Sequence, residues 1–174
     1  MRLAFGVEYD GTEWNGWQTQ ICKNTVQDAI ELALSKFASQ RIKIICAGRT
    51  DSGVHAKGQV IHFDTEINRQ IWNWIRGTNS LLPKSIRIKW GSIVSADFHA
   101  RFSAKSRTYS YTICNSPIES PLSSRSSTWI YQRLNEKKMQ LASECLIGKH
   151  DFSSFRSSEC QANSPVRIIN RCDL

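Results

Sequence analysis

A short polar loop between two apolar segments holds the residues of this chain that are best suited to chemistry. Residues 46–59, CAGRTDSGVHAKGQ, place Arg49, Asp51 and His55 among three glycines. An aspartate with a cation on one side and an imidazole on the other is well placed to act as an ionised carboxylate. The flanking residues are those of two buried strands, and loops held by strands are frequent sites of function. These flanking residues are Ile42, Ile44, Ile45, Val60, Ile61 and Phe63.

The same loop also has the residues of an ordinary turn. In Asp-Ser-Gly, residues 51–53, the aspartate can accept a hydrogen bond from the backbone, and the glycine can adopt a positive φ. A simple hairpin, however, needs only two to five linking residues, and it does not need an arginine and a histidine around the carboxylate. The loop alone leaves a structural and a functional interpretation open, and its composition favours the second.

Periodicity places this loop inside a predicted β-α-β-β-α-β unit. Residues 3–9 place Leu3, Phe5, Val7 and Tyr9 on one face of a strand. Asn24 and Gln27 have capping-box spacing before a helix whose apolar residues recur every three or four positions up to Phe37. Further strands are expected at 42–47, 59–64 and 86–95, with a second helix near 68–77. This order predicts an α+β fold with a ferredoxin-like unit.

A partial second unit of the same kind is expected to follow, so the sequence divides into an N-terminal unit, 1–96, and a second part, 97–174. The expected elements of the second part are a strand over 107–114, a Ser/Pro-rich connection over 116–128 and a helix over 135–148 that buries Met139, Ala142, Cys145 and Leu146. The chain then ends in an apolar stretch from Pro165 that reads as an inner strand with nothing to cover it. We therefore expect a truncated chain; a genuinely short protein or one completed by a partner are the alternatives.

Charge and aromatic residues point to a polyanionic partner. The 174 residues include 23 Lys and Arg against 15 Asp and Glu, a net charge of +8. Residues 98–114, FHARFSAKSRTYSYTIC, alternate cations with aromatic rings, as suits phosphates and unstacked bases. A core-facing aromatic strand beside a solvated basic loop is the alternative, and the charge excess favours RNA. Trp14 and Trp17 fit either a base-stacking platform or, more simply, a cover for the edge of the core.

Other classes of protein are disfavoured. The apolar runs are too short for a membrane span, and Met1 leads directly into a strand pattern, which indicates a cytoplasmic protein. The glycine-rich loop does not have the pattern of a P-loop. The cysteines show neither Cys-x-x-Cys nor zinc-type spacing, so we expect no metal and no structural disulfide. The six cysteines are Cys22, Cys46, Cys114, Cys145, Cys160 and Cys172.

Four motifs in order resemble the tRNA pseudouridine synthase A family: VEYDGTEWNGWQ, AGRTDSGVHAKGQV, FHARFSAKSRTYSY and GKHDFSSFR. The resemblance extends from the first strand to residue 174. It implies an isomerase that converts uridine to pseudouridine at positions 38, 39 and 40 of the tRNA anticodon stem-loop, working as a homodimer without cofactor or metal. It also implies that Asp51 is the catalytic nucleophile, that Tyr109 stacks on the target base and that Arg49 assists base flipping.

The implied reaction suits these residue types, because it breaks the N1–C1′ bond, turns the uracil and joins C5 to C1′. It needs a carboxylate near the sugar and a flat surface against the base. The residues do not decide whether Asp51 attacks C1′ or removes a ribose proton. The family carries a further arginine, paired with the aspartate, in the later half of its second unit, beyond residue 174. A non-catalytic RNA-binding remnant is therefore the alternative function. An aspartate-nucleophile hydrolase is disfavoured, because no second carboxylate follows Asp51 within ten residues.

Overall fold

The computed structural model describes residues 1–156 and 164–174, and Cys160 lies outside them. The chain divides into two units, Met1–Tyr109 and Ser110–Leu174. This boundary falls later than the one drawn from the sequence at 96/97, because the residues that follow β4 are bound to the first unit. The Arg2 guanidinium donates to the carbonyl of Phe98 at 2.9 Å, and the Ala100 N–H donates to His62 Nδ1 at 3.1 Å.

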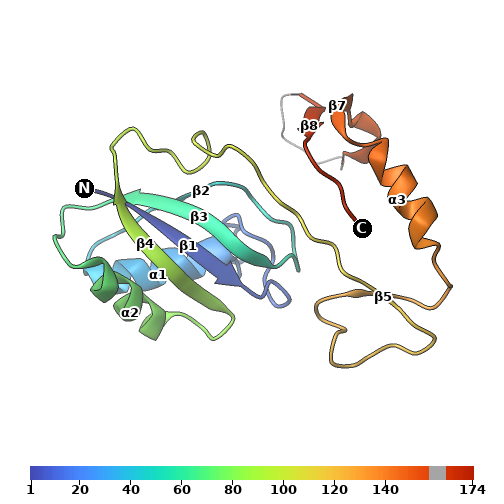
Figure 1. Cartoon of the computed structure of the whole chain (residues 1–174). Helices are drawn as coiled ribbons and strands as arrows, with labels where there is room; N and C mark the ends of the chain where they lie inside the picture. The colour runs from blue at the N-terminus through green and yellow to red at the C-terminus, as the bar shows by residue number, and fades with distance from the viewer. Residues whose placement is uncertain (157–163) are drawn as a thin grey trace. The chain divides into compact units, whose positions relative to one another are not determined.

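The first unit is a four-stranded antiparallel sheet with two helices, and it confirms the predicted α+β, ferredoxin-like arrangement. The strand order is β2-β3-β1-β4, so the first and third strands lie at the centre of the sheet. Figure 1 shows α1 and α2 beside one another along the same face of this sheet. The elements are β1 (Arg2–Tyr9), α1 (Val26–Ala38), β2 (Ile45–Cys46), β3 (Ala56–Asp64), α2 (Ile71–Leu81) and β4 (Ile86–Val94).

The core lies between this sheet and its helices. Leu3, Phe5, Val7 and Tyr9, which the sequence placed on one face of β1, are all buried, and Ala4 and Gly6 between them are buried as well. The Phe5 and Phe63 rings meet edge to face at 5.3 Å, and Phe63 reaches Trp74 of α2 at 5.5 Å. Trp74 and Phe37 of α1 are 5.2 Å apart, which joins the two helices. The contiguous aromatic contacts hold β1 and β3, the two central strands, against both helices.

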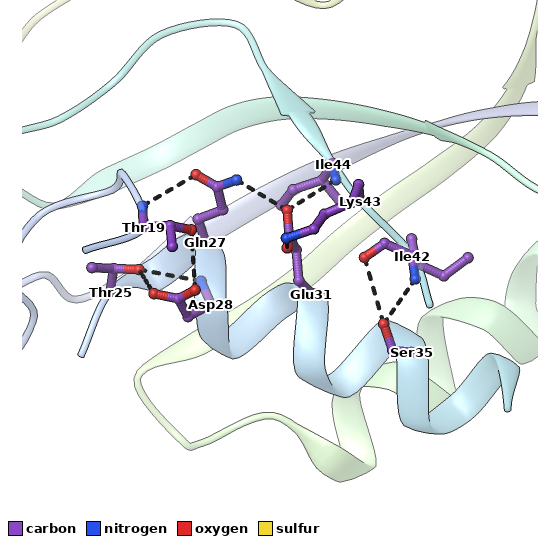
Figure 2. A network of polar contacts seen from close by, with 9 residues as sticks. All are labelled: Thr19, Thr25, Gln27, Asp28, Glu31, Ser35, Ile42, Lys43 and Ile44. Carbon is purple, nitrogen blue, oxygen red and sulfur yellow. Dashed lines mark hydrogen bonds and ion pairs between the residues drawn. The ribbon is translucent and has the colours of Figure 1, made fainter. Parts of the chain in front are cut away.

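Helix α1 begins one residue later than its predicted capping box. Thr25 is the N-cap: its Oγ1 accepts a hydrogen bond from the Asp28 N–H at 3.2 Å and donates to Asp28 Oδ2 at 2.6 Å. The Asn24 side chain instead donates to the carbonyl of Glu13, and Gln27 donates to the carboxylate of Glu31 at 3.0 Å (Figure 2). The predicted cap at Asn24 was therefore wrong, because the Asn24 amide binds the preceding loop and the Gln27 amide binds Glu31 within the helix.

Only two residues of the strand predicted at 42–47 pair with β3. The residues before them are bonded to side chains of α1 instead: Ser35 Oγ accepts from the Ile42 N–H at 2.9 Å, and Glu31 accepts from the Ile44 N–H at 3.2 Å (Figure 2). Lys43 completes the network with an ion pair to Glu31 at 2.6 Å. Ile42 and Ile44 are buried as predicted, but the helix supplies the hydrogen-bond partners that a neighbouring strand would have supplied.

The second unit contains short elements, and several predictions fail there. The strand predicted over 107–114 is regular only as β5 (Ile113–Asn115), which pairs in parallel with β6 (Thr128–Ile130). Helix α3 (Glu136–Glu144) is shorter than 135–148 at its C-terminal end. A 3₁₀ turn, Ser153–Phe155, follows β7 (Gly148–Asp151), and β7 pairs antiparallel with β8 (Val166–Ile169).

The expected buried helix face is also wrong, because no residue that the structure describes in the second unit is buried. Met139 and Leu146 are half-buried, and Ala142 and Cys145 are exposed. Ile168 of the predicted inner strand is 66% exposed. Two separate two-stranded sheets offer too little apolar surface to cover a helix face. Within residues 1–156 and 164–174, no helix is long and apolar enough to cross a membrane.

Candidate active site

The candidate site is the loop of residues 47–55, which joins β2 to β3 and exposes Asp51. The Ala47 N–H donates to the carbonyl of Val60 at 2.8 Å and closes the base of the loop. At its tip the Val54 N–H donates to the Asp51 carbonyl at 3.2 Å, and Gly53 adopts a φ of +79°. The loop therefore contains the turn that the sequence predicted, and this turn leaves the Asp51 carboxylate free to face solvent.

The segment that follows β1, residues 10–25, supports this loop on both sides of Asp51. The Thr50 carbonyl accepts from the Trp17 N–H at 2.9 Å, and the Thr50 hydroxyl lies 2.8 Å from the Tyr9 hydroxyl. On the other side, Ser52 Oγ and the Gly53 N–H both donate to the Trp14 carbonyl, at 3.2 and 3.3 Å. Residues 50–53 are thus attached to a second segment at several points, which limits the positions open to Asp51.

Two glycines of that segment allow this close approach. A Cβ on Gly16, whose φ is +79°, would lie 2.8 Å from the Thr50 carbonyl oxygen. A Cβ on Gly11 would lie 2.1 Å from the Val54 carbonyl oxygen. The motifs VEYDGTEWNGWQ and AGRTDSGVHAKGQV are therefore packed backbone to backbone, a contact that the sequence did not predict. The glycines of the first motif were the available signal.

We expect Gly16→Ala to destabilise the first unit more than Gly53→Ala. Both residues have a φ of +79°, so in both variants an alanine has to adopt the left-handed backbone region, which costs roughly 1–2 kcal/mol. Only at Gly16 does the new methyl group meet backbone, because nothing lies within 4 Å of a Cβ at Gly53. The added overpacking should cost about 1–3 kcal/mol more. Urea unfolding followed by the fluorescence of the buried Trp17 and Trp74 measures the difference. Equal midpoints for the two variants would contradict the backbone contact.

The base of the loop is fixed by side chains from β3 and from the segment after β4. Gln59 accepts from the Gly48 N–H at 3.3 Å and donates back to the Gly48 carbonyl. The Arg107 guanidinium donates to the Ala47 carbonyl through Nη2 at 2.6 Å. Burial raises the pKa of the Cys46 thiol, and the positive charges of Arg49 and Arg101 oppose this shift. Arginines from two segments therefore act on the last residue of β2.

Tyr9 and His55 make polar contacts around the loop. Burial raises the pKa of the Tyr9 hydroxyl, and its hydrogen bond to Thr50 acts in the opposite direction. The raised pKa keeps the hydroxyl protonated around neutral pH, so it can donate to Thr50. His55 Nδ1 accepts from the Gly11 N–H at 3.1 Å and lies 3.0 Å from an Asp10 carboxylate oxygen. His55 thus contacts the supporting segment.

The two tryptophans near the loop belong to the core. Trp17 is 1% exposed and its ring lies 5.8 Å from that of Tyr9. Trp14 is partly buried against the core, and its Nε1 donates to Ser85 Oγ at 3.2 Å. The simpler interpretation, a cover for the core edge, is confirmed, because neither ring is presented as an open platform.

The basic aromatic segment after β4, residues 98–114, has side chains that pack inward and side chains that face solvent. Phe98 is half-buried and meets the buried His62 edge to face at 6.0 Å. Phe102 is 77% exposed, stacks on His99 at 4.3 Å and has the Arg101 guanidinium 5.7 Å from its ring centre. Tyr109, the predicted base-stacking residue, is 83% exposed. Within this segment Phe98 packs inward, whereas Phe102 and Tyr109 face solvent and the expected core-facing strand is absent at Tyr109.

The structure brings the predicted site residues together only in part. Asp51 and Arg49 are exposed in the same loop, and Tyr109 lies two residues after Arg107, which contacts the base of that loop. The supporting residues Tyr9, Thr50, Gln59 and Arg107 were not predicted. In the portion of the chain that the structure describes, no group of three or more His, Cys, Asp or Glu side chains could hold a metal.

Comparison with known proteins identifies the family of this chain. A family model described as tRNA pseudouridine synthase matches residues 6–103, which include the loop and its supporting segment. The chain is 52% identical to tRNA pseudouridine synthase A of Herminiimonas arsenicoxydans over 97% of the chain and 63% of that relative. It is also 52% identical to the protein of that name from Legionella pneumophila (strain Lens), over 100% of the chain and 66% of the relative. The chain thus spans a little less than two thirds of these relatives, and it belongs to the tRNA pseudouridine synthase family.

Proposed function

We propose that this protein, together with the part of the enzyme that its relatives have in addition, converts uridine to pseudouridine in tRNA. The proposed targets are positions 38, 39 and 40 of the anticodon stem-loop. The observation that carries the proposal is the Asp51 loop, which is attached to the segment after β1 on both sides of an exposed carboxylate. The names of the relatives support the substrate class.

Asp51 is the proposed nucleophile. Isomerisation detaches N1 of the uracil from C1′, turns the base and attaches C5 to C1′, so a fixed carboxylate has to stay beside the sugar while the base moves. The hydrogen bonds of Thr50 and Gly53 to Trp17 and Trp14 supply this fixed position. A carboxylate that is held in place before the substrate arrives has less entropy to lose during the reaction.

Tyr109 and Arg49 are proposed to handle the base. The Tyr109 ring is 83% exposed, as a residue that stacks on an extruded base must be in the free protein. Arg49 is exposed two residues before Asp51, within reach of a phosphate or base next to the reacting sugar. The exposed Phe102, stacked on His99, and the net charge of +8 suit an RNA ligand.

The remaining proposals follow from the family alone. The complete enzyme is proposed to act as a homodimer in the cytoplasm, without cofactor or metal. Sedimentation of the complete protein would test the dimer. EDTA treatment would test the metal, and turnover should be unchanged.

The function is tested on this chain joined to the C-terminal third of the Legionella relative. We expect tritium release from anticodon stem-loops that carry C5-tritiated uridine at positions 38, 39 or 40. Replacing those uridines with cytidine, while labelled uridine stays elsewhere in the loop, is the control and should abolish release. Tritium release from other positions alone would contradict the proposed substrate. RNA binding without any release would favour the non-catalytic remnant instead.

A further inference from the structure

Arg107 makes a contact that the proposed chemistry does not yet use. Its Nη2 donates to the Ala47 carbonyl at 2.6 Å, where the chain leaves β2 and enters the Asp51 loop. The side chain also lies against Gly48, because a Cβ there would be 3.2 Å from Arg107 Nε. A guanidinium carries five donors in a planar fork, and one of them is engaged by this carbonyl.

This contact joins two segments that are 60 residues apart in the sequence. Residues 104–112 have no regular secondary structure, so no sheet or helix sets the position of Tyr109. Two residues of chain span at most about 7 Å, so the Tyr109 backbone stays near that of Arg107. Ala47 is likewise close in sequence to Asp51, in a loop fixed at both ends. The Arg107 hydrogen bond therefore limits the distance between Tyr109 and Asp51.

We propose that Arg107 is a positioning residue, which holds the base-stacking Tyr109 beside the loop that carries Asp51. The base-stacking role of Tyr109 in this inference rests on the proposed function, whereas the hydrogen bond of Arg107 is observed in the structure. One nitrogen of Arg107 donates to a backbone carbonyl of the loop, and this bond ties the segment that carries Tyr109 to the loop. Without this bond the Tyr109 side chain is unchanged, but its backbone is no longer held near the Asp51 loop and the ring is not aligned with the target base.

The first test uses the 174-residue chain without RNA. In ¹⁵N relaxation measurements, residues 106–109 should have order parameters near the rigid value of about 0.85 in the native chain and below about 0.6 in Arg107→Met. Lys105→Met removes the same charge from the same exposed segment and is the matched control; it should keep the native values. Unchanged order parameters in Arg107→Met would overturn the proposal, whatever the chain does with RNA.

The second test is a double-mutant cycle on the affinity of the chain for an anticodon stem-loop. Tyr109→Leu should weaken binding roughly 5- to 150-fold in the native background, the range expected for one lost base stack. In the Arg107→Met background it should weaken binding less than about twofold, because the ring is already misplaced. In the Lys105→Met background the full effect of Tyr109→Leu should remain.

Additive effects of Arg107→Met and Tyr109→Leu would overturn the positioning role. Together with a fall of about 0.7–0.9 in the log-log salt slope, additivity would identify Arg107 as a phosphate contact. No RNA binding by any variant would count against the proposed function, and the order parameters would still decide the Arg107 contact.

Discussion

Asp51→Asn is expected to abolish pseudouridine formation and to leave tRNA binding intact. Asparagine keeps the shape and the hydrogen-bonding atoms of the side chain, but it cannot act as an anionic nucleophile. The loop should keep its conformation, because its attachments run through the backbone of residues 50–53 and the Thr50 and Ser52 hydroxyls. Removing a nucleophile costs on the order of 10⁴- to 10⁶-fold in turnover in other enzymes. Tritium release from the chain joined to the Legionella C-terminal third measures this loss.

Asp97→Asn is the matched control for this substitution. Asp97 is an exposed carboxylate of the same unit, in the segment after β4, and its side chain lies near Ser95. Asp97→Asn should retain turnover within about twofold, since surface substitutions seldom change folding appreciably. Turnover retained by Asp51→Asn would refute the assignment of Asp51. Loss of both turnover and tRNA affinity would point to a binding role for this carboxylate.

The second large effect is expected for residues 1–174 alone, which should form pseudouridine at least about 100-fold more slowly than the chain joined to the Legionella C-terminal third. Asp51 is exposed to solvent here, and water weakens every electrostatic interaction that a closed active site would strengthen. No described residue after Ala100 is buried, so the second unit presents apolar side chains such as Leu141 and Ile168 to solvent. The resemblance to the family implies that a further arginine, paired with the aspartate, lies in the part that the relatives have in addition.

Adding that C-terminal third as a separate polypeptide should restore part of the activity. Its docking should also protect the exposed apolar side chains of the second unit from solvent. Tritium release is measured for the chain alone, for the added polypeptide alone and for the mixture, and a polypeptide of unrelated sequence is the control. Full turnover by the purified monomeric chain would contradict this expectation and would show that the residues needed for catalysis all lie within 1–174.

Periodicity predicted most of the first unit correctly, because its elements bury one continuous apolar face. The shared face of the large apolar side chains of β1 and the three-to-four spacing of α1 both follow from the side chains that face the core. The chain order of strands and helices then permits few topologies. The polar loop at 46–59 could be found for a similar reason, since its residues interrupt two apolar strands. The sequence alone thus determined the α+β fold, the order of the first unit and the location of the candidate nucleophile.

Tertiary contacts decided the rest, because they assign hydrogen-bond partners that no local pattern contains. Thr25 is the N-cap while Asn24 binds the Glu13 carbonyl, and Glu31 of α1 accepts from the backbone donor that would have extended β2. The expected α3 face is not buried. The sequence could not predict this, because a periodic pattern shows which side chains could pack but not whether another layer covers them. The position of Asp51 depends on the contacts of residues 50–53 with Trp14 and Trp17, which Gly16 permits and which form only when the chain folds.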